Sequence, residues 1–257
     1  MDTTIVLTSD LYEEFFQCIA NLRDLCTDVI IKDGIIRQRT DDKNSIFEMD
    51  LTDLFGEAVT IPISYFKVKF DLFKVFLGQE VTIKIHEDED AATNSWYEIS
   101  DTLSRIRFDF PAIEYLQNEF VTDEELAAIF TCVEDDIILD TQIEKTITER
   151  IKAITTNFQT HFVRMDFNGE TLSIGAVEPA KTNRVYFLEN LPVEMNFDEP
   201  HLANMTRVPF MINHDTSYTF KLFKQPDEMI TQNKITTSIG AVPISIYCKS
   251  TLLVEDE

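Results

Sequence analysis

The sequence contains the same signal twice, an amphipathic helical segment followed by a tight hairpin. Val29–Asp42 reads VIIKDGIIRQRTDD, and Phe162–Glu178 reads FVRMDFNGETLSIGAVE. Asp33-Gly34 and Asn168-Gly169 favour two-residue hairpin turns, because such turns need positive φ, which glycine adopts without a Cβ clash. Gly169 follows Gly34 by 135 residues. The chain is therefore expected to contain two copies of one structural unit.

Each hairpin is preceded by apolar residues at helical spacing. The first helix is expected to be capped by Ser9 or Asp10, and the second to run from a cap at Thr141 to about Asn157. The two stripes are Leu11, Phe15, Cys18, Ile19, Leu22 and Leu25, and then Ile143, Ile147, Ile151, Ile154 and Phe158.

A second, shorter helix is expected in each copy. One runs from a cap at Ser64 through Leu77, closed by Gly78, and the other covers His201–Ile212. The strands expected around these helices are Thr3–Leu7, Ser45–Leu51, Val59–Ile63, Val81–Ile85, Trp96–Ser100, Arg105–Phe110, Ile137–Leu139, Val185–Leu188, Pro192–Phe197, Tyr218–Phe223, Ile235–Ile239 and Pro243–Lys249.

These elements predict an α+β protein of two similar domains, each with antiparallel sheets packed on two helices. A polar, Glu-rich stretch after Pro111 has no strand character, and Thr122–Glu125 forms a capping box before LAAIF. We therefore expect a first domain at 1–118, a connector with one short helix at 119–136, and a second domain at 137–257.

The composition favours a globular, acidic protein. The 257 residues are 44% hydrophobic and carry 22 Lys and Arg against 46 Asp and Glu, a net charge of −24. A uniform surface of this sign would repel nucleic acid and anionic membranes, unless the few cations gather on one face. The N-terminus lacks a signal peptide, no apolar run is long enough to span a membrane, and the four cysteines are scattered. We expect a cytoplasmic protein with reduced thiols and no membrane partner.

Catalytic and metal-binding motifs are missing from the sequence. The four histidines are far apart, and the six glycines form no phosphate-binding loop. The acidic run Glu87–Asp90 lacks the glycine and the distal glutamate of a calcium loop, so we interpret it as a solvated loop tip. The sequence therefore predicts a protein that is not an enzyme and uses no cofactor or metal.

The expected helices are less acidic than the remainder of the chain, near neutral or slightly basic. Lys145 and Lys152 lie seven residues apart on the face opposite the isoleucine stripe, and Lys67 and Lys74 have the same spacing in the short helix of the first copy. Taken singly, each is most simply a solvated lysine. Together they contrast with the acidic remainder of the chain.

The order of elements resembles that of the DNA polymerase sliding clamps of the two-domain type, the proliferating-cell nuclear antigen of eukaryotes and archaea and the clamps of tailed phages. The sequence segments that carry the resemblance are LYEEFFQCIANL before VIIKDGI, and TITERIKAI before FVRMDFNGETLSI. The acidic, phenylalanine-rich and glycine-poor composition looks more like a phage protein than a cellular one.

The resemblance implies a homotrimeric ring of six domains around duplex DNA, which confers processivity on a DNA polymerase and is opened by a clamp loader. Helices line the hole, where cations contact phosphates without reading bases. The first helix departs from this pattern, because Glu13, Glu14 and Asp24 outnumber Arg23 on its outward side. The DNA-binding residues implied are Lys67, Lys74, Lys145, Arg150, Lys152, Arg207 and Arg23.

Two protein interfaces follow from the same resemblance. Edge strands of neighbouring subunits pair to close the ring, and short peptides of replication enzymes dock in an apolar pocket beneath the connector. The implied ring interface contains Arg105, Ile106, Arg107 and Phe108 on one side and Arg184, Val185, Tyr186 and Phe187 on the other. The implied peptide pocket contains Phe120, Val121, Ile129, Phe130, Leu252 and Leu253.

Two other functions fit the same sequence. A monomeric polymerase accessory factor of this fold would hold DNA by charge alone and would need one concentrated basic face. A virion or scaffold protein with two β-rich domains would show neither a basic interior nor any dependence on DNA. A hydrolase would need a catalytic constellation that the sequence does not contain.

Overall fold

The computed structural model shows a chain folded as two compact units. The first unit contains Met1–Lys43, Phe47–Thr122 and Ile239–Ile244, and the second contains Asn44–Ile46, Asp123–Ser238 and Ser245–Glu257. Each unit takes in a short piece of the other half of the chain, so the expected bounds 1–118, 119–136 and 137–257 remain a prediction. The structure describes residues 2–88, 94–112, 116, 118–131, 137–160, 162–167, 171–177, 185–192, 201–215, 217–223 and 230–252.

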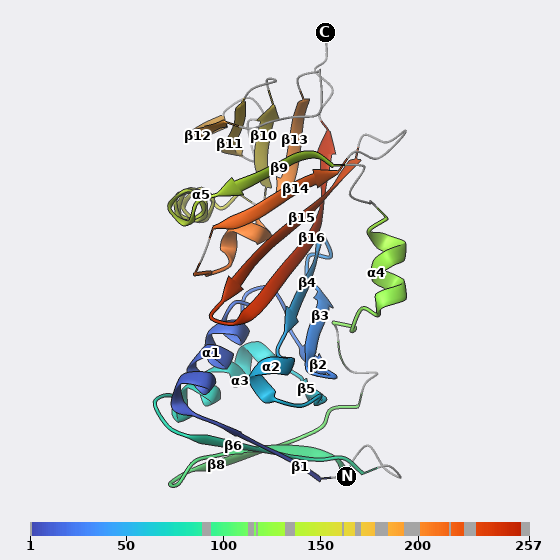
Figure 1. Cartoon of the computed structure of the whole chain (residues 1–257), viewed down its shortest axis with the longest axis vertical. Helices are drawn as coiled ribbons and strands as arrows, with labels where there is room; N and C mark the ends of the chain where they lie inside the picture. The colour runs from blue at the N-terminus through green and yellow to red at the C-terminus, as the bar shows by residue number, and fades with distance from the viewer. Residues whose placement is uncertain are drawn as a thin grey trace. The chain divides into compact units, whose positions relative to one another are not determined.

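The first unit consists of antiparallel strands with helices packed against them (Figure 1). One sheet has the order β1–β6–β7–β8, and a second group of strands has the order β4–β3–β2–β5. The elements are β1 Asp2–Leu7, α1 Ser9–Ala20, β2 Val29–Lys32, β3 Ile35–Arg39, β4 Ser45–Asp50, α2 Thr52–Phe55, β5 Ile61–Ile63, α3 Phe66–Phe73, the 3-10 helix η1 Lys74–Phe76, β6 Val81–His86, β7 Trp96–Ser100 and β8 Arg105–Asp109.

The turn between β2 and β3 has the expected conformation. Asp33 and Gly34 have φ values of 53° and 81°. A Cβ on Gly34 would lie 2.8 Å from the Thr52 hydroxyl oxygen, so both the backbone angle and the close approach of α2 require glycine. The Gly34 N–H donates to the Val59 carbonyl at 2.9 Å, and its own carbonyl accepts from the Leu51 N–H at 2.9 Å. The turn is therefore fixed by its surroundings as well as by its sequence.

Helix α1 begins one residue earlier than expected. Its cap is Thr8, whose hydroxyl accepts from the Leu11 N–H at 3.4 Å, because Ser9 already belongs to the helix. Phe15, Cys18 and Ile19 are buried as the spacing predicted, but Leu11 is 36% exposed. The prediction of the stripe is confirmed except at its first residue.

The second helical segment of the first unit is also capped differently from the prediction. Tyr65 precedes α3 with a φ of 52°, and no side chain caps the helix. The Ser64 hydroxyl instead accepts from the Lys69 ammonium at 3.2 Å. The alternating YFKVKF segment is helical because Phe66, Phe70 and Phe73 then share one buried face.

The second unit repeats this plan (Figure 1). The order β12–β11–β10–β13 matches β4–β3–β2–β5, and the pairing order β9–β14–β15–β16 matches β1–β6–β7–β8. The predicted fold of two similar α+β domains is confirmed. The elements are α4 Asp123–Ile129, β9 Ile137–Ile143, α5 Lys145–Asn157, β10 Phe162–Phe167, β11 Thr171–Val177, β12 Val185–Pro192, β13 His201–Thr206, the 3-10 helix η5 Val208–Met211, β14 Tyr218–Phe223, β15 Ile230–Ile239 and β16 Val242–Leu252.

Two predictions for the second unit are wrong. The expected helix His201–Ile212 is largely strand β13, because this segment pairs along its whole length with β10, and only the turn Val208–Met211 is helical. The expected cap Thr141 lies inside β9, which pairs with β14 as far as Ile143. In both places long-range strand pairing overrides the local signal. The Asn168-Gly169 turn and much of the predicted strand Pro192–Phe197 lie outside the described residues.

The buried face of α5 is rotated relative to the predicted isoleucine stripe. Ile147 and Ile151 are buried, together with Thr148 and Thr155. Phe158 is 45% exposed, although it continues the stripe. Each threonine hydroxyl donates to a backbone carbonyl within the helix, so both can be buried at little cost.

Cys26 provides a test of this packing. Burial and the nearby Asp41 carboxylate raise the pKa of the Cys26 thiol to about 12. A thiol with that pKa is a thiolate about once in 10^4 molecules at pH 8, so we expect iodoacetamide to label Cys26 about 1,000-fold more slowly in the native protein than in urea. Peptide mapping by mass spectrometry measures this ratio, and equal native and denatured rates would contradict the buried position.

Candidate nucleic-acid interface

Helices α1 and α3 form one side of the candidate site. The rings of Phe16 and Phe70 stack with centroids 4.9 Å apart, and the Tyr12 hydroxyl donates to the Phe73 carbonyl at 2.9 Å. These contacts fix α3 alongside α1. As a result, side chains from the turn after α1 can meet side chains from α3.

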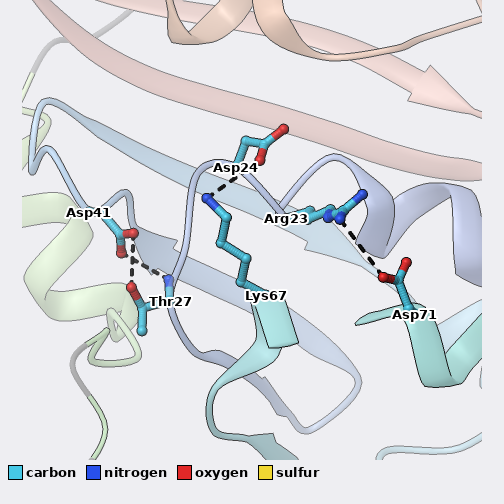
Figure 2. Close-up of polar contacts among 6 residues, drawn as sticks. All are labelled: Arg23, Asp24, Thr27, Asp41, Lys67 and Asp71. Atoms are coloured by element: carbon cyan, nitrogen blue, oxygen red, sulfur yellow. Dashed lines mark hydrogen bonds and ion pairs between the residues drawn. The ribbon is translucent and has the colours of Figure 1, made fainter. Parts of the chain in front are cut away.

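Three of the predicted DNA-binding cations, Arg23, Lys67 and Lys74, lie at this junction. Figure 2 shows Arg23 and Lys67 with their carboxylate partners. The Lys74 ammonium lies 2.9 Å and the Arg23 guanidinium 4.0 Å from the Asp71 carboxylate, and Lys67 lies 3.7 Å from Asp24. We call these five residues the α1–α3 charge cluster: Arg23, Asp24, Lys67, Asp71 and Lys74.

The ring of Phe70 organises two cations of the cluster. Arg23 lies over it at 5.2 Å and Lys74 at 5.4 Å. Because Phe70 is only 3% exposed, its ring is a fixed platform, and Asp71 is the next residue along the helix. The hydrogen bond from Lys74 is the main reason that the pKa of the Asp71 carboxyl is lowered.

The corresponding cations of the second unit lie on α5 and beside η5. Lys152 donates to the Asn213 amide oxygen at 2.9 Å, and Arg207 donates to the Thr155 carbonyl at 3.0 Å. Lys145 and Arg150 are exposed on α5. Among the residues that the structure describes, neither Lys145 nor Arg207 has a carboxylate within 4.0 Å. The described partner of Arg207 is therefore neutral, unlike the partners of the cations in the α1–α3 charge cluster.

Sequence reasoning missed two residues of this region. Asp71 contacts both Arg23 and Lys74, and its position three residues before Lys74 could have predicted one of these pairs. Lys69 donates to Ser64 and lies 5.5 Å from the Phe108 ring centroid, and burial lowers its pKa. No sequence pattern distinguishes this half-buried lysine from the exposed ones.

Both predicted ring-interface strands lie at sheet edges in the described part of the chain. β8 pairs only with β7, and β12 pairs only with β11. Arg105, Ile106, Arg107 and Phe108 belong to β8, and Val185, Tyr186 and Phe187 belong to β12, while Arg184 lies outside the described residues.

The edge of β8 has a defined pattern of outward-facing backbone groups. The Asp101 N–H donates to the Ser104 carbonyl at one end of the β7–β8 ladder, and the Phe110 N–H donates to the Ser95 carbonyl at the other. Hydrogen-bonded pairs alternate with non-bonded pairs in an antiparallel ladder. Arg107, which lies opposite Glu98, is therefore in a non-bonded pair. Its N–H and C=O face away from β7.

The connector segment is fixed at both ends by buried amide side chains. In the first unit, the Asn118 side chain accepts from the Thr27 and Asp28 N–H groups and donates to the Arg39 carbonyl and to Asp41. In the second unit, Gln232 accepts from the Thr131 N–H at 3.0 Å and donates to the Ile129 carbonyl at 2.8 Å.

The residues predicted to form a peptide pocket divide between the two units. Val121 is buried in the first unit, where Lys32 lies over the Phe120 ring at 5.3 Å. Phe130 contacts Phe223 and Tyr247 edge-on in the second. Ile129 is half-buried, the side chain of Leu252 is not described, and Leu253 lies outside the described residues. Their grouping into one pocket remains a prediction.

In the described ranges, no group of three His, Cys, Asp or Glu residues could hold a metal ion. The helices of those same ranges include none with the length and apolar character that crossing a membrane requires.

Comparison with known proteins gives matches by structure only. No protein-family model matches the chain, and a search of curated proteins finds no match. Among solved structures, the PCNA2–PCNA3 complex from Sulfolobus tokodaii matches with a TM-score of 0.61 and 12% identity, over 96% of this chain and 99% of that one. Proliferating Cellular Nuclear Antigen from Entamoeba histolytica matches with a TM-score of 0.62 and 10% identity, over 96% of this chain and 98% of that one.

A third structure, A. fulgidus PCNA with the C-terminal region of FEN-1 bound, matches with a TM-score of 0.57 and 10% identity, over the full length of both chains. At identities this low, the structural similarity establishes the fold, and the function has to be argued from the residues. The agreement extends over both units and all three structures. This chain therefore has the two-domain fold of the PCNA-type sliding clamps.

Proposed function

We propose that the protein is a sliding clamp, which closes into a homotrimeric ring around duplex DNA and tethers a replicative DNA polymerase. The observation that carries the proposal is the placement of cations: in a chain of net charge −24, seven predicted DNA contacts lie on or beside helices α1, α3, α5 and η5. Contacts of this kind with phosphates are weak and independent of sequence, as sliding requires. The clamp has no catalytic role.

Ring closure by edge strands is supported by exposed apolar residues near one edge. Val68, Leu72 and Val75 on α3 and η1 are 79%, 40% and 55% exposed. Helix α3 packs against β8, where the Phe73 ring stacks on the Phe108 ring with centroids 6.1 Å apart. An apolar patch beside an edge strand is typical of a surface covered by a partner. In the proposed ring, β12 of a second copy covers it.

The partners proposed are those of a replication clamp. The similarity to a structure of PCNA that holds a C-terminal region of FEN-1 supports peptide docking, and the similarity to a PCNA2–PCNA3 complex supports association between clamp chains. A clamp loader would open the ring. This role places the protein in the compartment of the replicating DNA, which for a phage-encoded clamp is the host cytoplasm.

Topological retention on DNA tests the proposal without the polymerase or the loader. A ring can thread onto a linear duplex through its ends, after which streptavidin on end-attached biotins blocks its escape. We expect protein trapped this way to resist a wash in 0.5 M salt, and protein mixed with DNA already blocked at both ends to wash off. Light scattering should give three times the 29.7 kDa chain mass. Release from both DNAs by a 29.7 kDa species would instead indicate a monomeric factor that binds by charge alone.

The cations of α5 should account for part of the affinity for DNA. We expect Lys145→Ala/Lys152→Ala to lower the slope of log K against log salt by about 2 for a fluorescent 30-bp duplex, since each phosphate contact contributes about 0.9. Lys84→Ala is a suitable control, because Lys84 is an exposed lysine on strand β6 rather than on a helix. A slope that does not change in the double variant would remove α5 from the DNA interface.

A further inference from the structure

The cations of the α1–α3 charge cluster are already in contact with carboxylates. Asp71 lies within 4.0 Å of both Arg23 and Lys74, and Asp24 lies 3.7 Å from Lys67. Figure 2 shows the Arg23–Asp71 and Lys67–Asp24 pairs. On the second unit, neither Lys145 nor Arg207 has a carboxylate within 4.0 Å among the residues that the structure describes. The two helix faces therefore present cations in different electrostatic states.

The arrangement of the α1–α3 charge cluster keeps its carboxylates close to the cations. Arg23 and Lys74 both lie over the buried ring of Phe70, the residue next to Asp71. Lys74 and Asp71 are also three residues apart in the same helical segment, a spacing at which side chains meet. The side chains of Asp24 and Asp71 are 77% and 62% exposed, so both carboxylates lie where an approaching phosphate would lie.

A phosphate must compete with these carboxylates. Ion pairs between exposed groups are weak, so phosphate can displace Asp71 from Lys74, but the displaced carboxylate stays nearby and repels it. The cluster has three cations and two carboxylates, so its net charge is +1 rather than +3. For charges several Å apart in water, Coulomb's law gives about a threefold weaker binding constant for each carboxylate.

We propose that Asp24 and Asp71 act as internal competitors of DNA phosphate, so that the first unit touches the duplex weakly and the second unit provides most of the affinity. The inference rests on the proposed function and specifies how that DNA interface is adjusted. Each ion pair in the cluster opens when a phosphate arrives and closes when it leaves. Weak, exchangeable contacts on this face favour sliding, while the closed ring prevents loss of the DNA.

The test is Asp24→Asn/Asp71→Asn, which removes two charges and keeps the shape of both side chains. For the 30-bp duplex in 50 mM salt, we expect the Kd to fall about tenfold and the slope of log K against log salt to steepen by between about 1 and 2. The matched control is Asp53→Asn/Glu57→Gln. It changes the net charge equally at two exposed positions of the first unit that form no described ion pair with the cluster.

The outcomes separate this inference from the proposed function. A tenfold gain in affinity for the duplex in Asp24→Asn/Asp71→Asn, with less than a twofold gain in affinity in the control, supports internal competition. Equal gains in both variants, or none in either, overturn it. If wild-type binding still depends on Lys145 and Lys152 in that case, the proposed function stands and the inference alone fails. If neither wild type nor any variant binds the duplex, both fail.

Discussion

Replacing Arg107 with proline is expected to convert the proposed ring into monomers. The Arg107 N–H faces away from β7, so proline there leaves the β7–β8 ladder intact and removes a donor from the outer edge. A second copy adding a strand at this edge would lose that hydrogen bond and meet the proline ring. We expect a loss of about 2–3 kcal/mol for each interface, roughly a 100-fold rise in its Kd.

Light scattering at micromolar concentration measures this result, and Arg107→Ala is the matched control. Both variants lose the ion pair with Asp109 and the stacking of Arg107 over Trp96 at 4.1 Å, but only proline removes the N–H. We expect the Arg107→Ala variant to keep a measured mass of three times the chain mass. An Arg107→Pro protein that stays trimeric would exclude β8 as the site of ring closure. Equal dissociation of the two variants would attribute closure to the side chain instead.

Replacing Asn118 with alanine is expected to lower the free energy of unfolding of the first unit by about 3 kcal/mol. The 5% exposed Asn118 side chain makes four hydrogen bonds, to the Thr27 and Asp28 N–H groups, the Arg39 carbonyl and Asp41. Alanine removes all four bonds, so the buried Asp28 N–H and the Arg39 carbonyl each lose a hydrogen-bond partner. Each buried polar group left unsatisfied costs about 1–3 kcal/mol.

The chain offers a specific probe for this measurement. Its one tryptophan, Trp96, lies on β7 in the first unit, so fluorescence during urea unfolding follows that unit. Asn94→Ala is the matched control, because Asn94 is exposed and bonds only to the Asp88 carboxylate among the described residues. We expect it to change the unfolding free energy by less than about 0.5 kcal/mol. Equal transitions for Asn118→Ala and wild type would mean that the connector is not anchored there.

Much of the fold could be predicted from the sequence because its strongest signals are local. The Asp33-Gly34 turn was predicted from two residues, and α5 was predicted to end at Asn157, where it does end. His201–Thr206 was predicted as helix because Pro200 suited a helix start, and it forms a strand because β10 lies beside it. Local propensity differs by a few tenths of a kcal/mol per residue, which a full ladder of backbone hydrogen bonds exceeds.

The candidate site could be predicted only in part. The spacing of Lys67 and Lys74 placed both on the exposed side of one helix, and the structure confirms that position. The pairing of Arg23 with Asp71 could not be predicted, because it joins residues 48 positions apart through the contact between α1 and α3. Helical spacing gives the side of a helix that a residue occupies but not the neighbour that covers it.

The sequence by itself determined the duplication, the hairpin turn between β2 and β3, and the helical spacing of the lysine pairs. Periodicity and turn chemistry depend on residues close together in the chain. Only the tertiary structure decided that β8 and β12 lie at sheet edges and that Asp24 and Asp71 lie against the cations. An edge strand is defined by its missing neighbour, and an ion pair between helices by their packing. Both depend on contacts between distant residues that form only when the chain folds.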